Sequence, residues 1–185
     1  MATVESPPKL LTAEEYAALS INEPTELVRG VIVPMPMPTY EHGRVCNEVA
    51  FRLTTFIREH GLGEVLSNDA GVITEREPDM VRGGDVAFYS FARFPKAERK
   101  APYAPVPPDL VFEVLSPCER WREVMEKVEE YLAAGVPMVC VMETEIRAMQ
   151  IFTPDKPMQT LRGEDEFVGS GTLAEFRIPV RKFFE

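Results

Sequence analysis

The sequence predicts an α/β domain with a central mixed β-sheet flanked by helices, and three observations support this fold class. Two long segments, 39–61 and 119–134, repeat apolar residues at spacings of three and four, which is typical of helices with one buried face. Short runs rich in β-branched and aromatic residues lie between and after them, each bounded by Gly, Pro, Asn or Asp. The order along the chain is helix, strand, helix, four strands, helix and further strands, which fits one sheet with helices packed on it.

The length and composition favour a single domain over residues 1–185. Of the 185 residues, 45% are hydrophobic, which is enough for a full core. No stretch approaches the roughly 18 apolar residues that a membrane span needs. Residues 1–11 lack the basic start and the apolar core of a secretion signal. We therefore expect a cytoplasmic protein without a membrane partner.

The N-terminal elements carry clear start and stop signals. Residues 12–15 (Thr-Ala-Glu-Glu) have the form of a capping box, which predicts a short helix that runs to about Ser20. Residues 26–33 predict a strand with a tight turn near Gly30. The prolines at 34, 36 and 38 end this strand, because proline cannot continue a sheet ladder.

A second, longer helix begins after Thr39 and ends at Gly61. Its buried face is predicted to consist of Val45, Val49, Leu53, Phe56 and Ile57. Four strands are predicted next, at 64–67, 71–74, 85–89 and 109–115. The helix 119–134 follows, with Trp121, Val124, Met125, Val128 and Leu132 on its apolar side and Gly135 at its end. Strands over 136–143 and 147–153 and a final pair of short strands complete the domain.

Charge and cysteine content limit the classes of function. The net charge of -10 argues against a protein that coats nucleic acid without specificity, although a local basic patch on an acidic protein can still hold phosphates. The one local excess is the segment 93–100, with four basic residues and one acidic residue, which is either such a patch or a solvated loop. Cys46, Cys118 and Cys140 form no CxxC pair, so we expect reduced thiols and no structural zinc site.

Two acids lie in segments that otherwise have the character of core strands. Glu113 lies inside the apolar run 109–115, and Asp85 stands at the head of another such run. A carboxylate in that setting needs a partner, because burying it alone is very costly. We infer that the two acids meet across neighbouring strands and hold a hard divalent cation. The alternative is an acid solvated at a strand edge, or paired with an arginine such as Arg82 or Arg120.

Lys127 lies on one flank of the apolar face of the helix 119–134, which starts a few residues after Glu113. A lysine at that place can reach back over the end of the Glu113 strand. The alternative is a surface lysine paired with Glu123 at i,i+4, and spacing alone favours this alternative.

Several motifs together carry a family resemblance. They are residues 11–16, 26–30, His42 at the start of the long helix, 82–88 and 108–117, followed by Lys127, Tyr131, Gly135 and Val136. On these motifs the chain resembles, over nearly its whole length, the Uma-type family of restriction-endonuclease-like proteins, a bacterial group within the PD-(D/E)XK nuclease superfamily. The block 109–117 with the four residues that follow it is the most specific part.

The resemblance implies a restriction-endonuclease-like core and a metal-dependent endonuclease with DNA as its substrate. Asp85 matches the "PD" aspartate of the superfamily, and Glu113 matches its "D/E". Leu115 stands where the superfamily lysine is expected, and in this family Lys127 of the next helix supplies it. Two other departures, Gly84 for a proline and Glu143 for an aspartate, remove no acid of the site. Gly84 is expected to relax the start of the Asp85 strand.

Two literal "PD" strings do not mark the site. Residues 80–84 after Pro78-Asp79 do not have a strand pattern, so we expect Asp79 in a loop. Asp109 shares a strand with Glu113, and four residues along a strand span roughly 13 Å, too far for both to bind one ion. We expect Asp109 to shape the start of its strand or to contact a surrounding group.

As a mechanistic hypothesis, Asp85, Glu113 and the backbone carbonyl of Val114 hold one Mg²⁺ (or Mn²⁺), which lowers the pKa of a bound water. Lys127 then positions this water or neutralises charge in the transition state.

Four other residues have less specific expectations. Glu26 extends the acidic cluster, and His42, near a helix N-terminus, contacts a phosphate or polarises a water. A purely structural role stays open for these two. Ser116 caps the following helix or contacts a phosphate, and Cys118 is a small packing residue.

Two further functions stay open. One alternative to a DNA nuclease is a non-catalytic binding or assembly module, which the acidic pI of about 4.8 favours. The other is a hydrolase of some other phosphodiester or nucleotide. The module would dimerise through an exposed sheet edge. Since no recognition domain is apparent, we expect a small, weakly specific nuclease, with a homodimer as a possible assembly.

Overall fold

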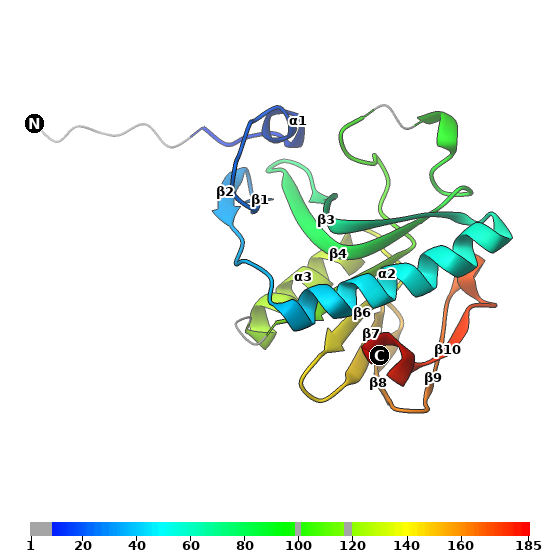
Figure 1. Ribbon diagram of the computed structural model, residues 1–185. Helices are drawn as coiled ribbons and strands as arrows, with labels where there is room; N and C mark the ends of the chain where they lie inside the picture. Colours follow the sequence, from blue (N-terminus) through cyan, green and yellow to red (C-terminus); the bar gives the residue numbers. More distant parts are fainter. Residues whose placement is uncertain (1–8, 99–100, 117–119) are drawn as a thin grey trace, which may run out of the picture.

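The helices and strands follow one another as the α/β prediction requires and form a mixed sheet with a long helix on each face (Figure 1). The computed structural model describes residues 9–98, 101–116 and 120–185. The helices are α1 (Ala13–Ala17), α2 (Tyr40–His60) and α3 (Trp121–Ala133), with short 3-10 turns η1 (Lys96–Glu98), η2 (Gly171–Leu173) and η3 (Val180–Phe184). The strands are β1 (Thr25–Val28), β2 (Val31–Pro34), β3 (Gly63–Glu75), β4 (Met80–Ser90), β5 (Leu110–Leu115), β6 (Val139–Glu143), β7 (Ala148–Thr153), β8 (Lys156–Arg162), β9 (Glu166–Val168) and β10 (Arg177–Pro179).

Among the described residues, the main sheet has the order β2-β1-β4-β5-β6-β7-β8, and β3 pairs with β4. β5 and β6 are parallel and the other neighbours are antiparallel, so the sheet is mixed, as predicted. β9 and β10 form the predicted final pair as a separate small sheet. β8 lengthens the main sheet and has no counterpart among the predicted strands. No helix in the described ranges has the length and apolar character to cross a membrane.

The N-terminal capping signals are confirmed. The Glu15 N–H donates to Thr12 Oγ1 at 3.1 Å, and the Thr12 N–H donates to Glu15 Oε2 at 3.0 Å. The helix ends at Ala17, earlier than predicted. The predicted turn near Gly30 makes β1 and β2 a hairpin, with Gly30 at a φ of 77°. A Cβ at Gly30 would lie 2.6 Å from the Cβ of Leu10, so both space and backbone conformation require glycine.

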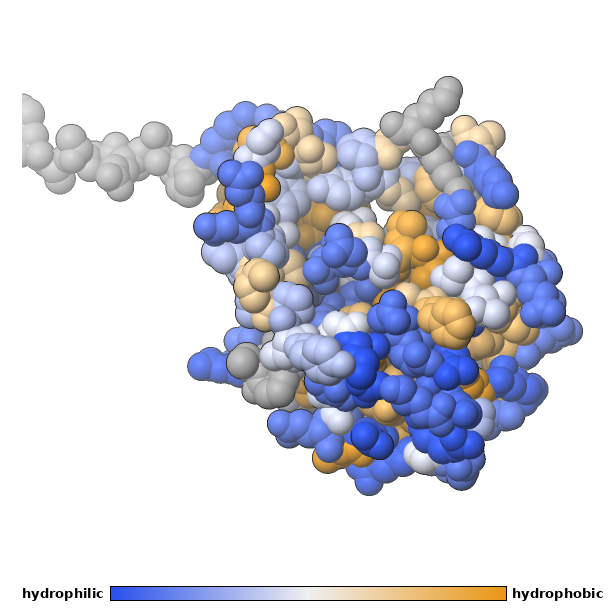
Figure 2. Space-filling view, viewed as in Figure 1, coloured by the Kyte–Doolittle hydropathy of each residue, from blue (hydrophilic) through white to orange (hydrophobic). Residues whose placement is uncertain are grey.

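Helix α2 forms between its predicted caps. The Thr39 side chain accepts from the His42 N–H, and Gly61 ends the helix in the left-handed conformation, with a φ of 64°. Four of the five predicted apolar residues are fully buried and Phe56 is partly buried. The surface on this side of the molecule is mostly hydrophilic, with scattered hydrophobic residues (Figure 2).

The two strands predicted at 64–67 and 71–74 are one long strand, β3, which is interrupted by a bulge between Ser67 and Ala70. Its partner β4 starts at Met80, so the prediction that residues 80–84 are not a strand is wrong. The glycines at 83 and 84 give no local strand signal, but antiparallel pairing with β3 supplies their backbone partners. Gly84 therefore lies inside β4 and not at its start.

Helix α3 packs its buried residues, Val124, Val128 and Tyr131, against the opposite face of the sheet from α2. Trp121, predicted on the buried side, is 40% exposed, and this prediction is wrong. The buried arc is rotated toward Tyr131 and away from Trp121. The predicted helix start at Glu119, together with Pro117 and Cys118, lies outside the described residues.

A gap in strand pairing shapes the region of interest. β4 pairs with β3 along one edge, whereas its other edge pairs with β1 at Val81 and with β5 from Val86 to Phe88. Residues 82–85 lie between these two partner strands. Carboxylates accept the backbone donors here: the Gly83 N–H donates to Glu26 at 3.0 Å, and the Val114 N–H donates to Asp85 at 2.5 Å. The gap therefore holds two acids inside the sheet.

Candidate active site

A cleft of about 400 Å³ opens at this gap. Its walls come from the linker after β2, the first turn of α2, the β3 bulge, strands β1, β4 and β5, and α3. The five side chains predicted to be catalytic all line it: Glu26, His42, Asp85, Glu113 and Lys127. Folding thus brings residues from five separate elements to one place.

Asp85 leans toward α2. Its Oδ1 lies 3.2 Å from His42 Nε2, and its Oδ2 accepts the Val114 N–H. The residue is 7% exposed. The carboxyl of Asp69, from the β3 bulge, hydrogen-bonds to Asp85, and partial desolvation and the Asp85 charge raise the pKa of Asp69 to about 6. Neither Arg82 nor Arg120 has a described ion pair with Asp85, so its chain partners are a histidine, a backbone N–H and a second acid.

Glu113 leans toward α3. Its Oε1 accepts a hydrogen bond of 2.8 Å from the Tyr131 hydroxyl, and its Oε2 lies 3.6 Å from Lys127 Nζ. The side chain is almost completely buried. Burial raises the pKa of Glu113 to about 8, because the Lys127 ammonium only partly offsets the desolvation and the Asp85 charge adds to it.

Lys127 is a buried cation and not a surface residue. Its ammonium lies 3.1 Å from Glu26 Oε1 and 3.6 Å from Glu113 Oε2, and its side chain is 12% exposed. The alternative of a surface lysine paired with Glu123 is therefore wrong. Burial opposes the charged form, but the carboxylates of Glu113 and Glu26 outweigh it and hold the pKa of Lys127 above its usual value.

Arg82 lines the cleft and shares the partner Glu26 with Lys127. Its guanidinium donates to Glu26 at 2.8 Å and makes a two-point contact with Glu130 at 2.5 and 2.8 Å. Glu26 therefore accepts from Arg82, from Lys127 and from the Gly83 N–H. We call Glu26, Arg82, Glu113, Lys127 and Glu130 the α3 half of the cleft.

The other half is built around α2. We call His42, Cys46, Asp69 and Asp85 the α2 half; the Cys46 sulfur lies 3.5 Å from His42 Nδ1. Asp69 reaches the cleft because Asn68 and Asp69 both adopt positive φ, 66° and 53°, in the β3 bulge. Gly83 leaves room for it, since a Cβ there would lie 3.0 Å from the Asp69 Cβ.

Sequence reasoning assigned no site role to Arg82, Asp69, Cys46 or Tyr131. Tyr131 belongs to the family motif and lies one helical turn after Lys127 on the same flank of α3. This spacing could have identified its hydroxyl as a site residue. Asp69 gave no such signal, because it reaches the cleft only through the bulge, and Cys46 does not line this cleft but contacts His42.

The two acids of the "PD" strings have structural roles, as expected. Asp79 lies in the turn before β4, accepts the Ala13 N–H at 2.7 Å and pairs with Arg76. Asp109 accepts the Ser90 N–H at 2.8 Å just before β5 begins. Ser116 lines the cleft and is buried. Cys118 lies outside the described residues.

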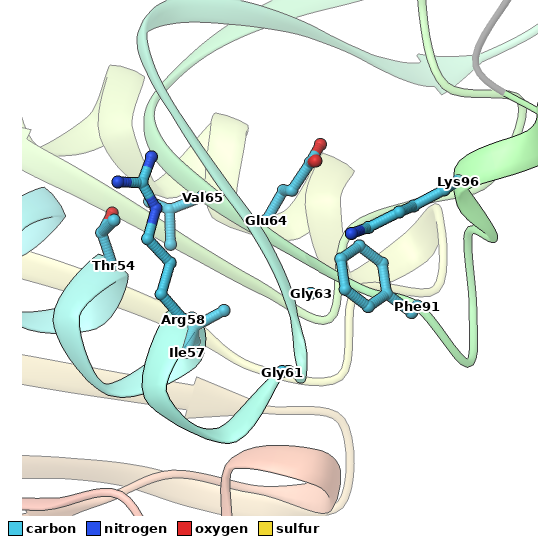
Figure 3. Close-up of a pocket in the computed structure, with 9 residues that line it drawn as sticks. All are labelled: Thr54, Ile57, Arg58, Gly61, Gly63, Glu64, Val65, Phe91 and Lys96. Carbon is cyan, nitrogen blue, oxygen red and sulfur yellow. The ribbon is translucent and has the colours of Figure 1, made fainter.

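The basic segment does not line the cleft in the part of it that is described. Arg93 donates to the carbonyls of Pro107, Pro108 and Gly135. Lys96 Nζ lies 4.5 Å from the centroid of the Phe91 ring, beside a separate hollow of about 340 Å³ at the C-terminal end of α2 (Figure 3). Residues 99 and 100 lie outside the described ranges.

Comparisons with known proteins agree with this architecture. The sequence model of the Uma2 family, described as "Putative restriction endonuclease", matches residues 13–181. Among solved structures, the chain is similar to a putative nuclease belonging to DUF820 from Anabaena variabilis ATCC 29413, with a TM-score of 0.80 and 18% identity over 94% of this chain and 97% of that chain. At this identity the similarity confirms the fold. No curated protein matches the chain.

Proposed function

The chain belongs to the Uma2 family, and from this membership together with the geometry of the cleft we propose that it is a metal-dependent endonuclease that hydrolyses phosphodiester bonds in DNA. One observation carries the proposal. Two buried carboxylates from adjacent strands, Asp85 and Glu113, share a cleft with the Lys127 ammonium. A third acid, Glu26, holds this ammonium in place.

The donor set fits a hard divalent cation. Carboxylate oxygens are the ligands that Mg²⁺ and Mn²⁺ prefer. Burial, with the Asp85 charge adding to it, raises the pKa of Glu113, and a bound cation would favour its ionised form. Asp85 and Glu113, with the Val114 carbonyl, would hold the ion. The ion would supply Lewis acidity toward a phosphate and lower the pKa of a bound water.

The protonated state of Lys127 indicates which catalytic role it can have. Because its neighbours keep it protonated, it is unsuited to accept a proton and suited to offset the negative charge that develops on a phosphate in the transition state. Glu26, which accepts from both Lys127 and Arg82, holds the ammonium in position. We assign Glu26 a positioning role.

Three donors orient the two metal-binding acids. Tyr131 directs one oxygen of Glu113, while the Val114 N–H and the His42 ring contact opposite oxygens of Asp85. His42 lines the cleft beside Asp85, and we assign it the orientation of Asp85, with a phosphate or water as its second contact. Ser116 remains a candidate phosphate donor.

The test is cleavage of plasmid DNA with Mg²⁺ or Mn²⁺ by the wild type, Asp85→Asn and Glu113→Gln. Glu129→Gln is the matched control, because this exposed acid of α3 does not line the cleft. We expect metal-dependent cleavage by the wild type and the control and none by the two cleft variants. Equal cleavage by all four proteins would refute the assignment.

A non-catalytic module of the same fold is the second candidate. The net charge of -10 and the distance of the described basic segment from the cleft favour it, since both weaken attraction to a polyanion. Calorimetric titration with Mg²⁺ discriminates: binding that Asp85→Asn abolishes supports the nuclease, and absence of binding supports the module. RNA and a small diester substrate in the cleavage assay separate DNA hydrolysis from that of other phosphodiesters.

We also propose a homodimer in the cytoplasm. β2 ends the strand order of the main sheet, and Val31 and Val33 on it are 49% and 40% exposed. Light scattering of the wild type and Val33→Lys tests this: a wild-type monomer would refute the dimer.

A further inference from the structure

A second cavity, of about 240 Å³, adjoins the cleft on the side of α2. Its chemically active lining consists of His42 and Cys46 from α2, Asp69 from the β3 bulge and Asp85 from β4. These side chains offer one imidazole, one thiol and two carboxyl groups. The α3 half of the cleft has no histidine or cysteine among its five residues, so the two halves differ in the softness of their donor atoms.

The spacing of these atoms suits one small cation. His42 and Cys46 are four residues apart on α2 and therefore lie on the same side of the helix. One ligand atom from each of His42, Cys46 and Asp85 can be chosen so that all three lie within 4.8 Å of one another. With Nε2 as the ligand atom of His42, the distances are 3.9 Å to the Cys46 sulfur and 3.2 Å to Asp85 Oδ1. Ligands of a tetrahedral zinc ion are separated by about 3.3–3.8 Å, given its usual bond lengths.

We propose that His42, Cys46 and Asp85 form a metal site for a borderline-soft divalent cation of the zinc class, which shares Asp85 with the proposed hard-cation site at Asp85 and Glu113. Nitrogen and sulfur donors favour such a cation over Mg²⁺, which takes oxygen ligands. Asp69 is the nearest further acid and is available as a fourth ligand.

The electrostatics of the α2 half point the same way. Burial, followed by the negative charges of Asp85 and Asp69, holds the pKa of the Cys46 thiol above its usual value. The negative charges of Asp85 and Asp69 attract a divalent cation, and a bound cation would take the place of the thiol proton.

Cobalt is the probe for the test, because Co²⁺ occupies zinc sites and a thiolate ligand gives it a charge-transfer absorption that carboxylates do not give. The full chain is titrated with Co²⁺ and then with Zn²⁺, as wild type, Cys46→Ser and Cys118→Ser. We expect the absorption in the wild type and in Cys118→Ser, its loss on adding Zn²⁺, and its absence in Cys46→Ser. Far-ultraviolet circular dichroism checks that the variants are folded.

Two outcomes would overturn the proposal: no charge-transfer absorption in the wild type, or an absorption that survives Cys46→Ser and disappears in Cys118→Ser. Glu113→Gln separates this site from the proposed nuclease centre. We expect it to retain the Co²⁺ absorption while losing metal-dependent cleavage. If the wild type cleaves nothing, the Co²⁺ result still stands, so the two proposals fail independently.

Discussion

The two halves of the cleft differ in how their charge is balanced. In the α3 half, two cations and three acids lie in contact, and Glu113 has in addition the Tyr131 hydroxyl. In the α2 half, two carboxyl groups share a hydrogen bond beside an imidazole and a thiol. The difference indicates that the α3 half carries a fixed positive charge of its own, whereas the four residues of the α2 half include no lysine or arginine.

Removing the fixed positive charge should have the largest effect. We expect Lys127→Met to lower the cleavage rate by about 10²–10³-fold, the usual loss when one group that stabilises transition-state charge is removed. Lys127→Arg should recover part of the rate, since it keeps the charge. Initial rates at saturating Mg²⁺ measure the effect, with Lys156→Met on β8 as the exposed control. A wild-type rate in Lys127→Met would show that the α3 half has no electrostatic role.

Removing the other cation of the α3 half, Arg82, should lower the free energy of unfolding. Arg82→Met leaves Glu26 and Glu130 without their shared partner, and breaking a buried ion pair costs about 3–5 kcal/mol. Arg122→Met is the matched control, because Arg122 pairs with Glu126 at a side-chain exposure of 88% and should cost at most about 1 kcal/mol. Urea denaturation compares the two, and equal costs would contradict a buried, charge-balanced α3 half.

The hydroxyl of Tyr131 should contribute less to the free energy of unfolding than Arg82 does. Tyr131→Phe keeps the packing of the ring and deprives Glu113 of one donor, which costs about 1–3 kcal/mol when the acceptor is buried. Tyr40→Phe is the control, since Tyr40 is 86% exposed. A loss no greater than that of the control would show that Glu113 does not depend on this bond.

The last expected effect is a pH dependence of the stability of the metal-free protein. Because the pKa of Glu113 is raised from 4.5 to about 8 in the folded state, the folded chain keeps a proton that the unfolded chain has released between these values. The free energy of unfolding should therefore fall as the pH rises through this window. Asp69, with its pKa raised to about 6, adds to the fall in the lower part.

Glu113→Gln removes the upper part of this pH dependence, because glutamine does not titrate. Thermal melts of the wild type and the variant between pH 5 and 8, within the window set by the two pKa values, measure the difference. The same slope in both proteins would show that Glu113 is ionised throughout the window.

The sequence was sufficient to predict the α/β class and to predict that Asp85 and Glu113 lie on neighbouring core strands. Asp85 and Glu113 stand out because each is a carboxylate in an otherwise apolar strand, and burial makes such a residue conspicuous. Lys127 was less certain, because its spacing from Glu123 suggested an exposed pair. Only the packing of α3 shows that its buried arc includes Lys127 and excludes Trp121.

The parts that local patterns did not predict depend on long-range pairing. The first half of β4 contains two adjacent glycines, and β3 alone makes it a strand. The gap between β1 and β5, which places Arg82 in the cleft, and the bulge that carries Asp69 both follow from this pairing. His42 and Cys46 lie one turn apart on α2, but Asp69 and Asp85 come from β3 and β4, and no local motif connects them to the helix.

The central claim is that Asp85 and Glu113 together hold the cation, and the anomalous scattering of Mn²⁺ in crystals of the protein tests it most directly. We predict a manganese peak in contact with both carboxylates, with Lys127 beside it. No peak in the cleft, or one that contacts Asp85 from the side of His42 and Cys46 without Glu113, would contradict the account.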